Sequence, residues 1–315
     1  MMKLKNLVEN FDLARLALSH YPHDTDSLDE ILPRFRISSN AVYPYFNQGK
    51  LCFLRLAPLE EKAPAQVKAE IDFIQYLRGH GYPAMQPISS KTGELSFLLN
   101  SPWGQYCVSS FASVSGSSLE DTPLTPEIVH AYGQQLGRLH SLSSAYDAPA
   151  VRPAWNEVLA PSVLQLVQAE PGIIKACEKL FDALQALPAD SVCYGLIHYD
   201  FEPDNVFWDA YTHSISVIDF DDCLYGWYAM DVAQALNELD SVWGDTFLTG
   251  YRSAFPFSAE QEATLPLMQR YIMLRSYARL KYCLSEDVAA PPEWMKNLRT
   301  MLEEKLLLLE KTITT

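Results

Sequence analysis

The sequence of 315 residues predicts an α+β fold with two lobes: a small N-terminal lobe with an antiparallel sheet and one main helix, and a larger, mostly helical C-terminal lobe. The length suits two lobes that share a cleft. Strand-like segments dominate before residue 113, and helical patterns dominate after it. The polar segment Ser113–Ser118, rich in small residues, connects the two parts. We therefore expect lobes at 1–112 and 113–315.

Three helices are predicted in the N-terminal lobe. Two short ones are expected at 6–20 and 25–32. The main helix should cover 64–79, because apolar residues recur there with helical spacing on one face. Gly79 or Gly81 can end this helix.

The sheet of this lobe is predicted from a hairpin. The apolar runs Ala41–Phe46 and Leu51–Leu56 flank the residues 47–50, Asn-Gln-Gly-Lys, which form a turn by composition. Pro44 has no N–H for a central strand, so it should lie at a sheet edge or a bulge. Two further strands are expected at 94–100 and 105–112.

The C-terminal lobe is predicted to be mostly helical. Its helices are expected at 125–143, 173–187, 228–240, 243–254, 260–285 and 292–313. Pro291 and Pro292 separate the last two, since proline cannot continue a helix. Strand signals in this half are limited to Ser191–Ile197, Val206–Trp208 and Ile215–Ile218.

The composition excludes several classes of protein. With 48% hydrophobic and 20% charged residues, the chain is globular rather than disordered. A net charge of −15 argues against nucleic-acid binding, because phosphate backbones require clustered lysine and arginine. The acidic excess fits a small cationic acceptor, or it has no specific meaning, since many soluble proteins are acidic.

Targeting signals and cysteine usage predict a cytoplasmic protein. No apolar run approaches the roughly 20 residues that a membrane helix needs, and Glu9 comes too early for a secretory signal. The six cysteines lie far apart with no Cys-x-x-Cys pair, which favours reduced core thiols over disulfides or a zinc site. We expect no membrane and no nucleic-acid partner, and the sequence does not indicate an oligomeric state.

The segment His198–Asp222 is the most informative part of the sequence. It places Asp200, then Asn205 five residues later, and Asp219 after the apolar run Ile215–Ile218, which predicts a buried strand. A loop followed by a short hairpin would bring Asn205 near Asp219. Phosphoryl transfer from a nucleotide needs a carboxylate that orients the acceptor and oxygen ligands for magnesium. The segment therefore indicates a kinase.

Other kinds of site could contain such a segment. In isolation, a loop rich in Asp and Asn is most often a plain turn. A calcium loop starting at Asp200 would need glycine at position 6 and glutamate at position 12, where Asn205 and Tyr211 stand. An iron site lacks a suitable third ligand, since the later His213 is predicted in a hairpin turn. The sequence has no Gly-x-Ser-x-Gly motif of a serine hydrolase at a strand-to-helix turn. It also has no phosphate-binding P-loop motif and no Gly-x-Gly-x-x-Gly motif of a dinucleotide site.

The segment resembles the aminoglycoside phosphotransferase and choline kinase-like family, which has a bilobal protein-kinase-like fold. The family's catalytic loop, His-Gly-Asp-x-x-x-x-Asn, is similar to His198–Asn205. Its metal motif, Ile-Asp-Phe/Trp-Glu/Asp, is similar to Ile218–Asp222. The resemblance extends over most of the chain and implies a phosphotransferase that uses ATP and Mg²⁺ to phosphorylate a hydroxyl of a small molecule.

The resemblance also implies roles for residues of the C-terminal lobe. It makes Asp200 the catalytic base, and Asn205 and Asp219 the magnesium ligands. His198 is expected to support the structure by bonding to the loop backbone. Asp231 resembles a buried aspartate that braces the catalytic loop, although a plain acid at a helix N-terminus fits the sequence as well.

In the N-terminal lobe the resemblance implies nucleotide contacts. Ser39 and Asn40 belong to a segment similar to the nucleotide loop, whose backbone N–H groups contact phosphates. Phe111 and Ser113 belong to a segment similar to the hinge, whose backbone receives the adenine. Whether the nucleotide is ATP or GTP stays open.

One position departs from the family pattern. The strand position of the phosphate-holding lysine is Arg55, and Glu70 resembles the helix glutamate that pairs with that lysine. Arginine keeps the charge but is longer and planar, so the exchange is not conservative. Arg55 could bridge Glu70 and the phosphates, or it could mark a weak or inactive kinase-like protein that serves as a nucleotide-binding scaffold.

The acceptor is expected near the catalytic loop and the C-terminal helices. Candidate contacts are Glu202, Asp204, Asp221, Trp227, Tyr228 and either Tyr271 or Tyr277; Asp221 and Asp222 could instead support the metal. Carboxylates and aromatic rings suit an amine-bearing acceptor such as an aminoglycoside, a choline-like amine or an amino alcohol. Sugars and homoserine fit less naturally, and each aromatic residue could also be a core residue.

Overall fold

The computed structural model describes residues 2–6, 9–147, 151–288 and 291–314, and the chain divides into two units. Unit 1 comprises the described residues before Tyr76 together with Met85–Ser113 and Arg279–Lys305. Unit 2 comprises the remainder, Tyr76–Ala84, Val114–Ala278 and the residues from Leu306 onward. The chain leaves unit 1 at Ser113, beside the expected lobe boundary, but it also crosses between the units at four other places. The division of tasks between two lobes stays a prediction.

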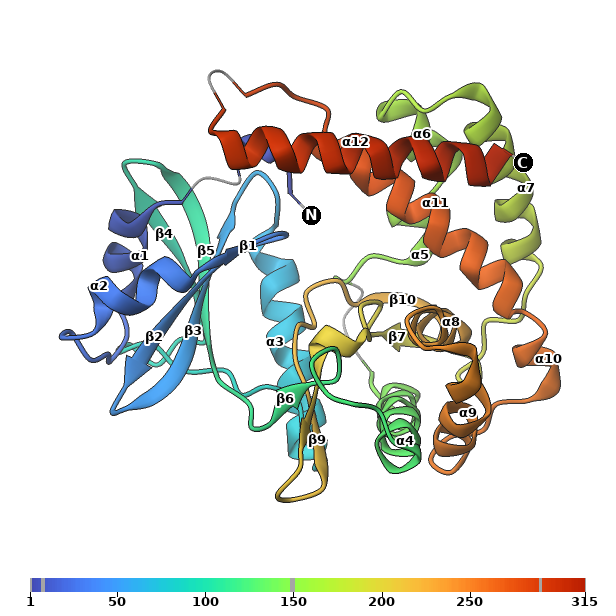
Figure 1. The fold of residues 1–315 in the computed structure, drawn as a ribbon, viewed down its shortest axis with the longest axis horizontal. Coiled ribbons are helices and arrows are strands. Elements are labelled where there is room, and N and C mark those ends of the chain that lie inside the picture. The colour runs from blue at the N-terminus through green and yellow to red at the C-terminus, as the bar shows by residue number, and fades with distance from the viewer. Residues whose placement is uncertain (1, 7–8, 148–150, 289–290, 315) are drawn as a thin grey trace. The chain divides into compact units, whose positions relative to one another are not determined.

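A five-stranded antiparallel sheet forms the centre of unit 1 (Figure 1). The strands lie in the order β1 (Arg36–Ile37), β2 (Ala41–Asn47), β3 (Lys50–Pro58), β5 (Gly104–Ala112) and β4 (Ser96–Ser101). The predicted hairpin is confirmed as β2 and β3. The short strand β1 pairs only with Ala41 and Val42, so Pro44 lies where β2 is open at its edge, as expected.

The hairpin turn follows from its two central residues. Asn47 pairs with Lys50, so the loop contains only Gln48 (φ 52°) and Gly49 (φ 72°). Two positive φ angles define the turn whose twist matches that of the strands. The carboxylate of Asp24 accepts hydrogen bonds from both turn amides, at 2.9 and 2.8 Å, and so holds the turn.

Side-chain alternation gives the two faces of this sheet different neighbours. Leu54 and Leu56 of β3 are fully buried in a core that they share with α1 (Phe11–Leu18). Arg55, between them, points to the opposite face because strand side chains alternate. On that face lies α3 (Pro64–Gly79), which has the bounds that the sequence predicts.

The first two predicted helices are shorter than expected. Asn10 accepts a hydrogen bond from the amide of Leu13 and caps α1, so this helix begins only at Phe11. Residues 7–8 of the predicted helix lie outside the described residues. The second helix is α2 (Leu28–Ile31), followed by one 3-10 turn, Leu32–Arg34, that includes Pro33.

Two small sheets lie in unit 2. The strands β6 (Ser117–Ser118), β8 (Val206–Asp209) and β9 (Ser214–Val217) form one sheet, and β7 (Tyr194–Ile197) pairs with β10 (Leu224–Trp227) in the other. Strand β10 is not among the strands expected from the sequence. Its four residues include Gly226 and show no alternating pattern, so only the pairing with β7 makes them a strand.

Helices make up most of unit 2, as predicted. They are α4 (Pro126–Ser143), α5 (Trp155–Val158), α6 (Pro161–Leu166), α7 (Pro171–Gln185), α8 (Tyr228–Asn237), α9 (Gly244–Arg252) and α10 (Ala259–Glu262). Helix α11 (Leu265–Cys283) begins in unit 2 and ends in unit 1, and α12 (Glu293–Thr314) begins in unit 1 and ends in unit 2. The expected helix at 260–285 is interrupted before Leu265. Pro266 explains the interruption, because it supplies no N–H and starts α11 afresh.

The six cysteines are all buried and free of disulfides, as the sequence predicts. In the described part of the chain, none of the helices combines the length and apolar character needed to cross a membrane.

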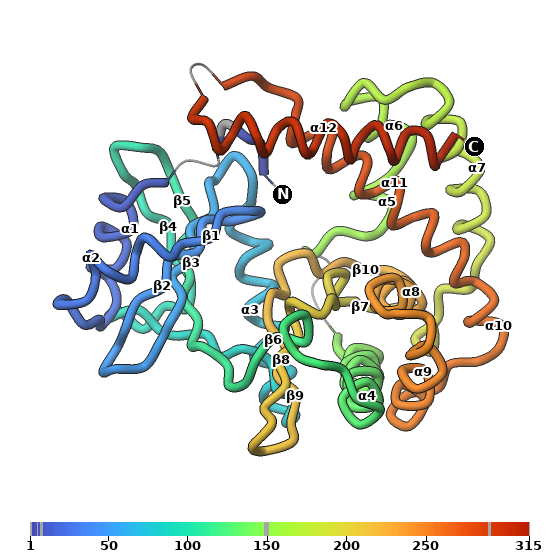
Figure 2. Tube along the Cα trace, viewed as in Figure 1, coloured from blue at the N-terminus to red at the C-terminus, as the bar shows by residue number. Residues whose placement is uncertain are grey.

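Helices α4 and α9 lie side by side at very close range (Figures 1 and 2). A Cβ atom added at Gly250 of α9 would lie 2.0 Å from the carbonyl oxygen of His130 in α4. A Cβ atom added at Gly133 of α4 would lie 2.0 Å from the carbonyl oxygen of Phe247. Backbone therefore packs on backbone here, and a larger residue at either position would separate the helices.

We expect Gly250→Ala to lower the free energy of unfolding by about 2 kcal/mol or more, because the new methyl group must push two backbones apart. Urea unfolding should show a lower midpoint with an unchanged slope. Gly244→Ala, at the start of the same helix, is the matched control, since the nearest atom that its Cβ would meet outside the adjacent backbone is Leu236 Cδ2, at 3.9 Å. Equal midpoints for the two variants would contradict the close packing of α4 and α9.

Candidate functional site

The hairpin β8–β9 brings the two ends of the polar segment together in unit 2. Asn205 is the last residue of a 3-10 turn, Pro203–Asn205, directly before β8. Asp219 is the second residue after the end of β9. The amide of Ile218 donates a hydrogen bond to the carbonyl oxygen of Asn205, at 3.0 Å. Residues thirteen positions apart in sequence are thus bonded to each other, and Asp219 directly follows the second of them.

Asp200 and Asn205 are in direct contact. The side-chain nitrogen of Asn205 donates to Oδ2 of Asp200 at 2.9 Å and to the carbonyl oxygen of Asp200 at 3.0 Å. The amide nitrogen of Asn205 therefore faces Asp200. Its side-chain oxygen is the atom that Asn205 can offer to a cation beside Asp219.

The described residues contain no group of three His, Cys, Asp or Glu side chains that could hold a metal ion. A cation at this place would therefore depend on the amide oxygen of Asn205 together with the carboxylate of Asp219. This donor set consists of oxygen atoms, as magnesium prefers. Asp219 has a positive φ of 58°, and its Oδ1 accepts from the amide of Asp221 at 3.4 Å.

A single buried carboxylate holds the backbone before Asp200. Asp231, in the first turn of α8, accepts hydrogen bonds from the amides of His198 and Tyr199, at 2.8 and 2.7 Å. His140 of α4 also contacts Asp231, with Nε2 3.0 Å from Oδ2. Three elements of unit 2 therefore meet at one carboxylate.

His140 extends this network to α9. Its Nδ1 lies 2.7 Å from the hydroxyl of Tyr251. Burial lowers the pKa of His140, although Asp231 opposes the shift, and burial raises the pKa of Tyr251 well above its ordinary value. A neutral His140 that donates to Asp231 can then accept the hydroxyl hydrogen of Tyr251. Nothing in the sequence signalled that His140 and Tyr251 belong to the support of the loop.

His198 links the loop to the end of β9. Its Nε2 lies 3.0 Å from the carbonyl oxygen of Ile218, and its Nδ1 accepts from the amide of Asp200 at 3.3 Å. Burial lowers the pKa of His198 to about 4. A neutral ring with Nε2 protonated satisfies both contacts.

Tyr199 has an unusual backbone conformation. Its φ is 59°, in the left-handed region that non-glycine residues rarely adopt, and glycine stands at the corresponding place of the family's loop. Its ring is buried and lies edge-on to Tyr271 of α11, with 6.0 Å between ring centroids. A side chain that the family's loop lacks thus connects the residue before Asp200 to α11.

Arg152 supports the acidic segment through backbone carbonyl groups. This buried side chain donates from Nε to the carbonyl oxygen of Cys223 at 2.8 Å and from Nη2 to the carbonyl oxygen of Asp221. Asp221 is itself buried, whereas Asp222 is partly exposed. Arg152 was not expected to belong to the site, because an arginine about seventy residues from the motif carries no local signal.

The residues predicted to line the acceptor site differ in exposure. Asp204 is exposed, and Glu202 is partly exposed and accepts from Gln234 at 2.7 Å. The aromatic side chains are in the core of unit 2: Trp227 donates to the carbonyl oxygen of Pro188, and Tyr228, Tyr271 and Tyr277 have no exposed surface. Their rings fill the core, so these aromatic residues leave no surface for an acceptor.

In unit 1, Arg55 forms a bidentate ion pair with Glu70. Nη1 and Nη2 lie 2.8 and 2.7 Å from the two carboxylate oxygens, and Nε donates to the hydroxyl of Ser109 at 3.2 Å. The guanidinium also lies over the ring of Phe111, 4.9 Å from its centroid. Because Arg55 is 5% exposed and Glu70 is 0% exposed, the pair is nearly dry.

The other residues expected to contact the nucleotide have partners in unit 1. The hydroxyl of Ser39 accepts from Arg279 at 3.0 Å, and Asn40 is buried in the turn between β1 and β2, where its carbonyl oxygen accepts from Ser38. The amide of Ser113 donates to the carbonyl oxygen of Leu51 at 3.0 Å. An adenine at this segment would therefore need groups other than that amide.

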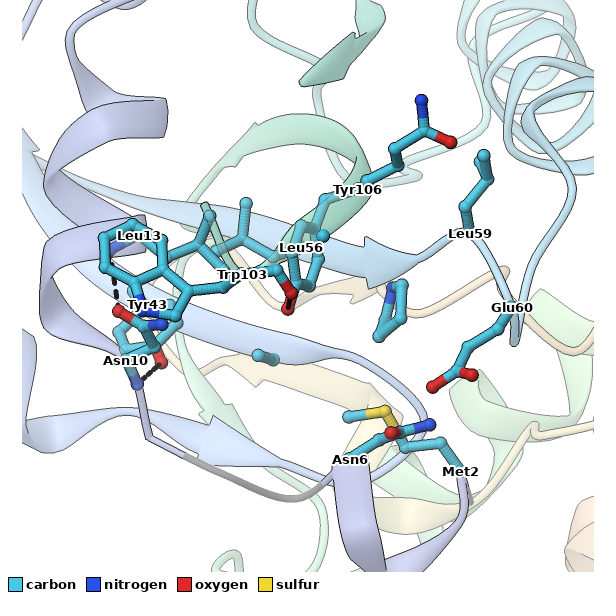
Figure 3. A pocket seen from close by; sticks show the side chains of 14 residues that line it. Met2, Asn6, Asn10, Leu13, Tyr43, Leu56, Leu59, Glu60, Trp103 and Tyr106 are labelled. Carbon is cyan, nitrogen blue, oxygen red and sulfur yellow. Dashed lines mark hydrogen bonds between the residues drawn. The ribbon is translucent and has the colours of Figure 1, made fainter. Parts of the chain in front are cut away.

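A pocket of about 560 Å³ lies elsewhere in unit 1. Figure 3 shows Asn10, Tyr43 and Trp103 together at one end of it and Glu60 toward the other. Tyr43 belongs to the core on the α1 side of the sheet, opposite to the face of Arg55. None of the six residues expected to contact the nucleotide is among those that line this pocket.

The chain is similar to known phosphotransferases. The model of the "Phosphotransferase enzyme family" matches residues 45–265, more than half of the chain. An amicoumacin kinase of Bacillus subtilis is 22% identical over 62% of this chain and 59% of its own length. A homoserine kinase of Rhodospirillum rubrum is 28% identical over 65% of each chain. The chain thus spans about three fifths to two thirds of the curated relatives that it matches.

Solved structures show the same fold. The amicoumacin kinase hAmiN, in complex with AMP-PNP, Ca²⁺ and Ami, has a TM-score of 0.77 and 20% identity, over 98% of this chain and 95% of its own. A microcompartment-associated aminopropanol kinase has a TM-score of 0.68 and 23% identity, over 97% and 99%. The predicted kinase-like fold is therefore confirmed.

We expect either partner of the ion pair in unit 1 to be costly to remove alone. Glu70→Gln should lower the free energy of unfolding by about 3 kcal/mol or more, because Arg55 is left with an uncompensated buried charge. The double variant Arg55→Met/Glu70→Leu should recover most of this loss, because no buried charge remains. Chemical unfolding of the single and double variants measures the coupling. If the double variant lost as much stability as the two single variants together, the two side chains would not be coupled.

The buried histidines predict a loss of stability in acid. Between pH 6.5 and about pH 4 the unfolded chain protonates His198 whereas the folded chain does not, so the free energy of unfolding falls as the pH falls. The contribution of His198 is up to about 3 kcal/mol, and His140 adds a loss of the same sign. Urea unfolding at pH 7 and pH 4.5 should show a smaller difference for His198→Gln than for the wild type. An equal difference would show that His198 does not titrate as the geometry predicts.

Proposed function

Because the chain belongs to the phosphotransferase enzyme family, we propose that it is a kinase that transfers the γ-phosphate of ATP, with Mg²⁺, to a hydroxyl of a small, amine-bearing molecule. The contact of Asp200 with Asn205, with Asp219 alongside, is the observation that carries this proposal. The structural neighbours named for aminopropanol and for aminoglycosides support an acceptor that has both an amine and a hydroxyl.

We assign the proton transfer to Asp200. Its carboxylate would orient the acceptor hydroxyl and accept its proton as the phosphoryl group arrives. The surrounding contacts hold it in place: Asp231 fixes the two preceding amides, and the imidazole of His198 accepts from the amide of Asp200 itself. A base held this way needs little reorganisation before reaction.

We assign the metal to Asn205 and Asp219. When bound there, magnesium would neutralise charge on the phosphate oxygens during transfer. Asn205 turns its nitrogen toward Asp200 and so keeps its side-chain oxygen for the cation. Asp221 and Asp222 would support this site or attract the amine of the acceptor.

We propose that unit 1 binds the nucleotide. Arg55, held by Glu70, would take the place of the usual lysine near the α- and β-phosphates, and Phe111 would lie near the base with Ser39, Asn40 and Ser113. Because the contacts with Glu70 and Ser109 hold the guanidinium of Arg55 in place, its contribution would be a fixed positive charge. One neighbour is an aminoglycoside phosphotransferase in complex with GDP, so GTP is the competing nucleotide to compare.

We expect Asp200→Asn to lower kcat by about 10²–10⁴-fold while the affinity for the nucleotide changes little, because only proton transfer is lost. ADP release with a panel of amino alcohols and aminoglycosides measures the activity, and calorimetry with ATP or GTP measures the binding. Asp209→Asn, at the end of β8, is the matched control and should keep full activity.

The same measurements decide between the kinase and a catalytically inactive nucleotide-binding scaffold, which Arg55 brought into consideration. Full activity in Asp200→Asn would refute the assignment of the base. Nucleotide binding that is indifferent to magnesium, together with no ADP release from the wild type on any acceptor, would favour the scaffold.

A further inference from the structure

The pocket in unit 1 lies on the face of the sheet opposite to Arg55. Ala41 of β2 pairs with Leu56 of β3, and Pro58 of β3 pairs with Tyr106 of β5. Residues that pair directly share a face of the sheet, and so do Leu56 and Pro58, which are two positions apart. All four line the pocket of about 560 Å³. The floor of the pocket is therefore the reverse side of the strand that carries Arg55.

The N-terminal segment forms part of the pocket wall and is held there by a carboxylate. Asn6 lines the pocket, and its side-chain nitrogen donates to Glu61 at 2.6 Å. The amide of Lys3 and the hydroxyl of Tyr282 donate to the same carboxylate, at 3.0 and 2.9 Å. These three donors are uncharged, and the ammonium group of Lys3 contacts Glu286 instead. The donors therefore hold Glu61 without neutralising its charge.

Trp103 stands at a tight turn, where a large ring is unusual. Ser101 pairs with Gly104, so the loop between β4 and β5 contains only Pro102 and Trp103. The hydroxyl of Ser101 accepts from the amide of Trp103 at 3.2 Å and donates to the carbonyl oxygen of Gly104 at 2.8 Å. Such turns favour small or polar residues. The side chain of Trp103 nevertheless lines the pocket, and the residue is 47% exposed. A well-held turn thus presents an aromatic ring that the core does not use.

The charges at the pocket are negative. Among the described residues that line it, Glu60 alone has a formal charge, and this side chain lies toward one end of the pocket (Figure 3). Burial raises the pKa of Tyr106, and the charge of Glu60 raises it further. Burial also raises the pKa of Tyr43; the hydrogen bond from Asn10 opposes this shift, and the charge of Glu9 adds to it. Negative charge therefore reaches two aromatic residues that line the pocket, and a cation would be favoured there over an anion.

We propose that this pocket is a second ligand site, which binds an organic cation with an aromatic body and lies apart from the catalytic residues. The ring of the ligand packs on Trp103 and the apolar floor, and its ammonium group is attracted by the aromatic faces and by Glu60. The volume of the pocket suits a ligand of small-molecule size. The inference goes beyond the proposed function, because binding at this place requires no phosphoryl transfer.

Three indole probes test the inference on the wild type. Tryptamine, tryptophol and indole-3-acetate share one ring system and carry a positive charge, no charge and a negative charge. Calorimetry should give tryptamine a Kd of about 0.1–1 mM, as expected for a ligand of this size. Tryptophol should bind about fivefold more weakly, because it lacks the cation, and indole-3-acetate more weakly still. Ethylamine, which keeps the charge without the ring, should show no binding at the same concentrations. Equal affinity for the three indoles would overturn the inference.

Variants then locate the binding. Trp103→Ala should weaken the binding of tryptamine roughly tenfold or more, because the ring that packs on the ligand is lost. Glu60→Gln should remove the preference for tryptamine over tryptophol and leave the affinity for tryptophol unchanged. Two exposed positions of unit 1 outside the pocket are the matched controls: Trp294→Ala on α12, where the tryptophan is 49% exposed, and Glu30→Gln on α2. Both should bind tryptamine as the wild type does.

Tryptamine is an amine, so its binding must be distinguished from binding at the proposed acceptor site. Titration into Asp200→Asn, and into the wild type saturated with ATP and Mg²⁺, should return the Kd of the wild type, because the pocket contains none of the residues assigned to catalysis. The inference is refuted if Asp200→Asn or the bound nucleotide abolishes the binding, or if Trp103→Ala binds tryptamine as tightly as the wild type. If Trp103→Ala does not fold, Glu60→Gln and the series of indoles decide. None of these titrations depends on turnover, so their outcome is independent of the test of the proposed function.

Discussion

The candidate site of unit 2 depends on the carboxylate of Asp231. It accepts from two successive amides, those of His198 and Tyr199, and it also receives His140. A buried carboxylate is tolerated only when its oxygens are satisfied, so the loop, α4 and α8 must come together for the charge to be stable. The same contacts leave Asp200 with little freedom. The contacts that stabilise unit 2 therefore also fix the position of Asp200.

The positive φ of Tyr199 follows from this arrangement. Two consecutive amides can point at one carboxylate only if the chain turns sharply between them, and a left-handed residue makes that turn. Glycine adopts this conformation without strain, whereas tyrosine does so at a cost of about 1 kcal/mol or more. The ring compensates by packing against Tyr271, which ties the loop to α11. In this chain, the position that corresponds to the glycine of the family's motif thus gains a contact with α11.

In unit 1 the side chains of β3 point alternately to the two faces of the sheet, and the two faces have different roles. Leu54 and Leu56 enter the core below α1, and Arg55 between them meets Glu70 of α3 on the other face. The exchange of lysine for arginine is accommodated by two carboxylate oxygens, one serine hydroxyl and the ring of Phe111. These contacts use the planar guanidinium of arginine. The single ammonium group of a lysine could not make all of them.

The sequence by itself determined the elements with a strong local signal. The hairpin of β2 and β3, the bounds of α3, and the succession of Asp200, Asn205 and Asp219 follow from periodicity, turn residues and spacing over short distances. Only the tertiary structure decided the rest. Strand β10 exists because it pairs with β7, Arg152 and His140 reach the loop from distant segments, and the aromatic residues expected around an acceptor are core residues. These features depend on contacts between residues far apart in the chain, and local sequence carries no record of which distant side chain will satisfy a buried charge or cover a ring.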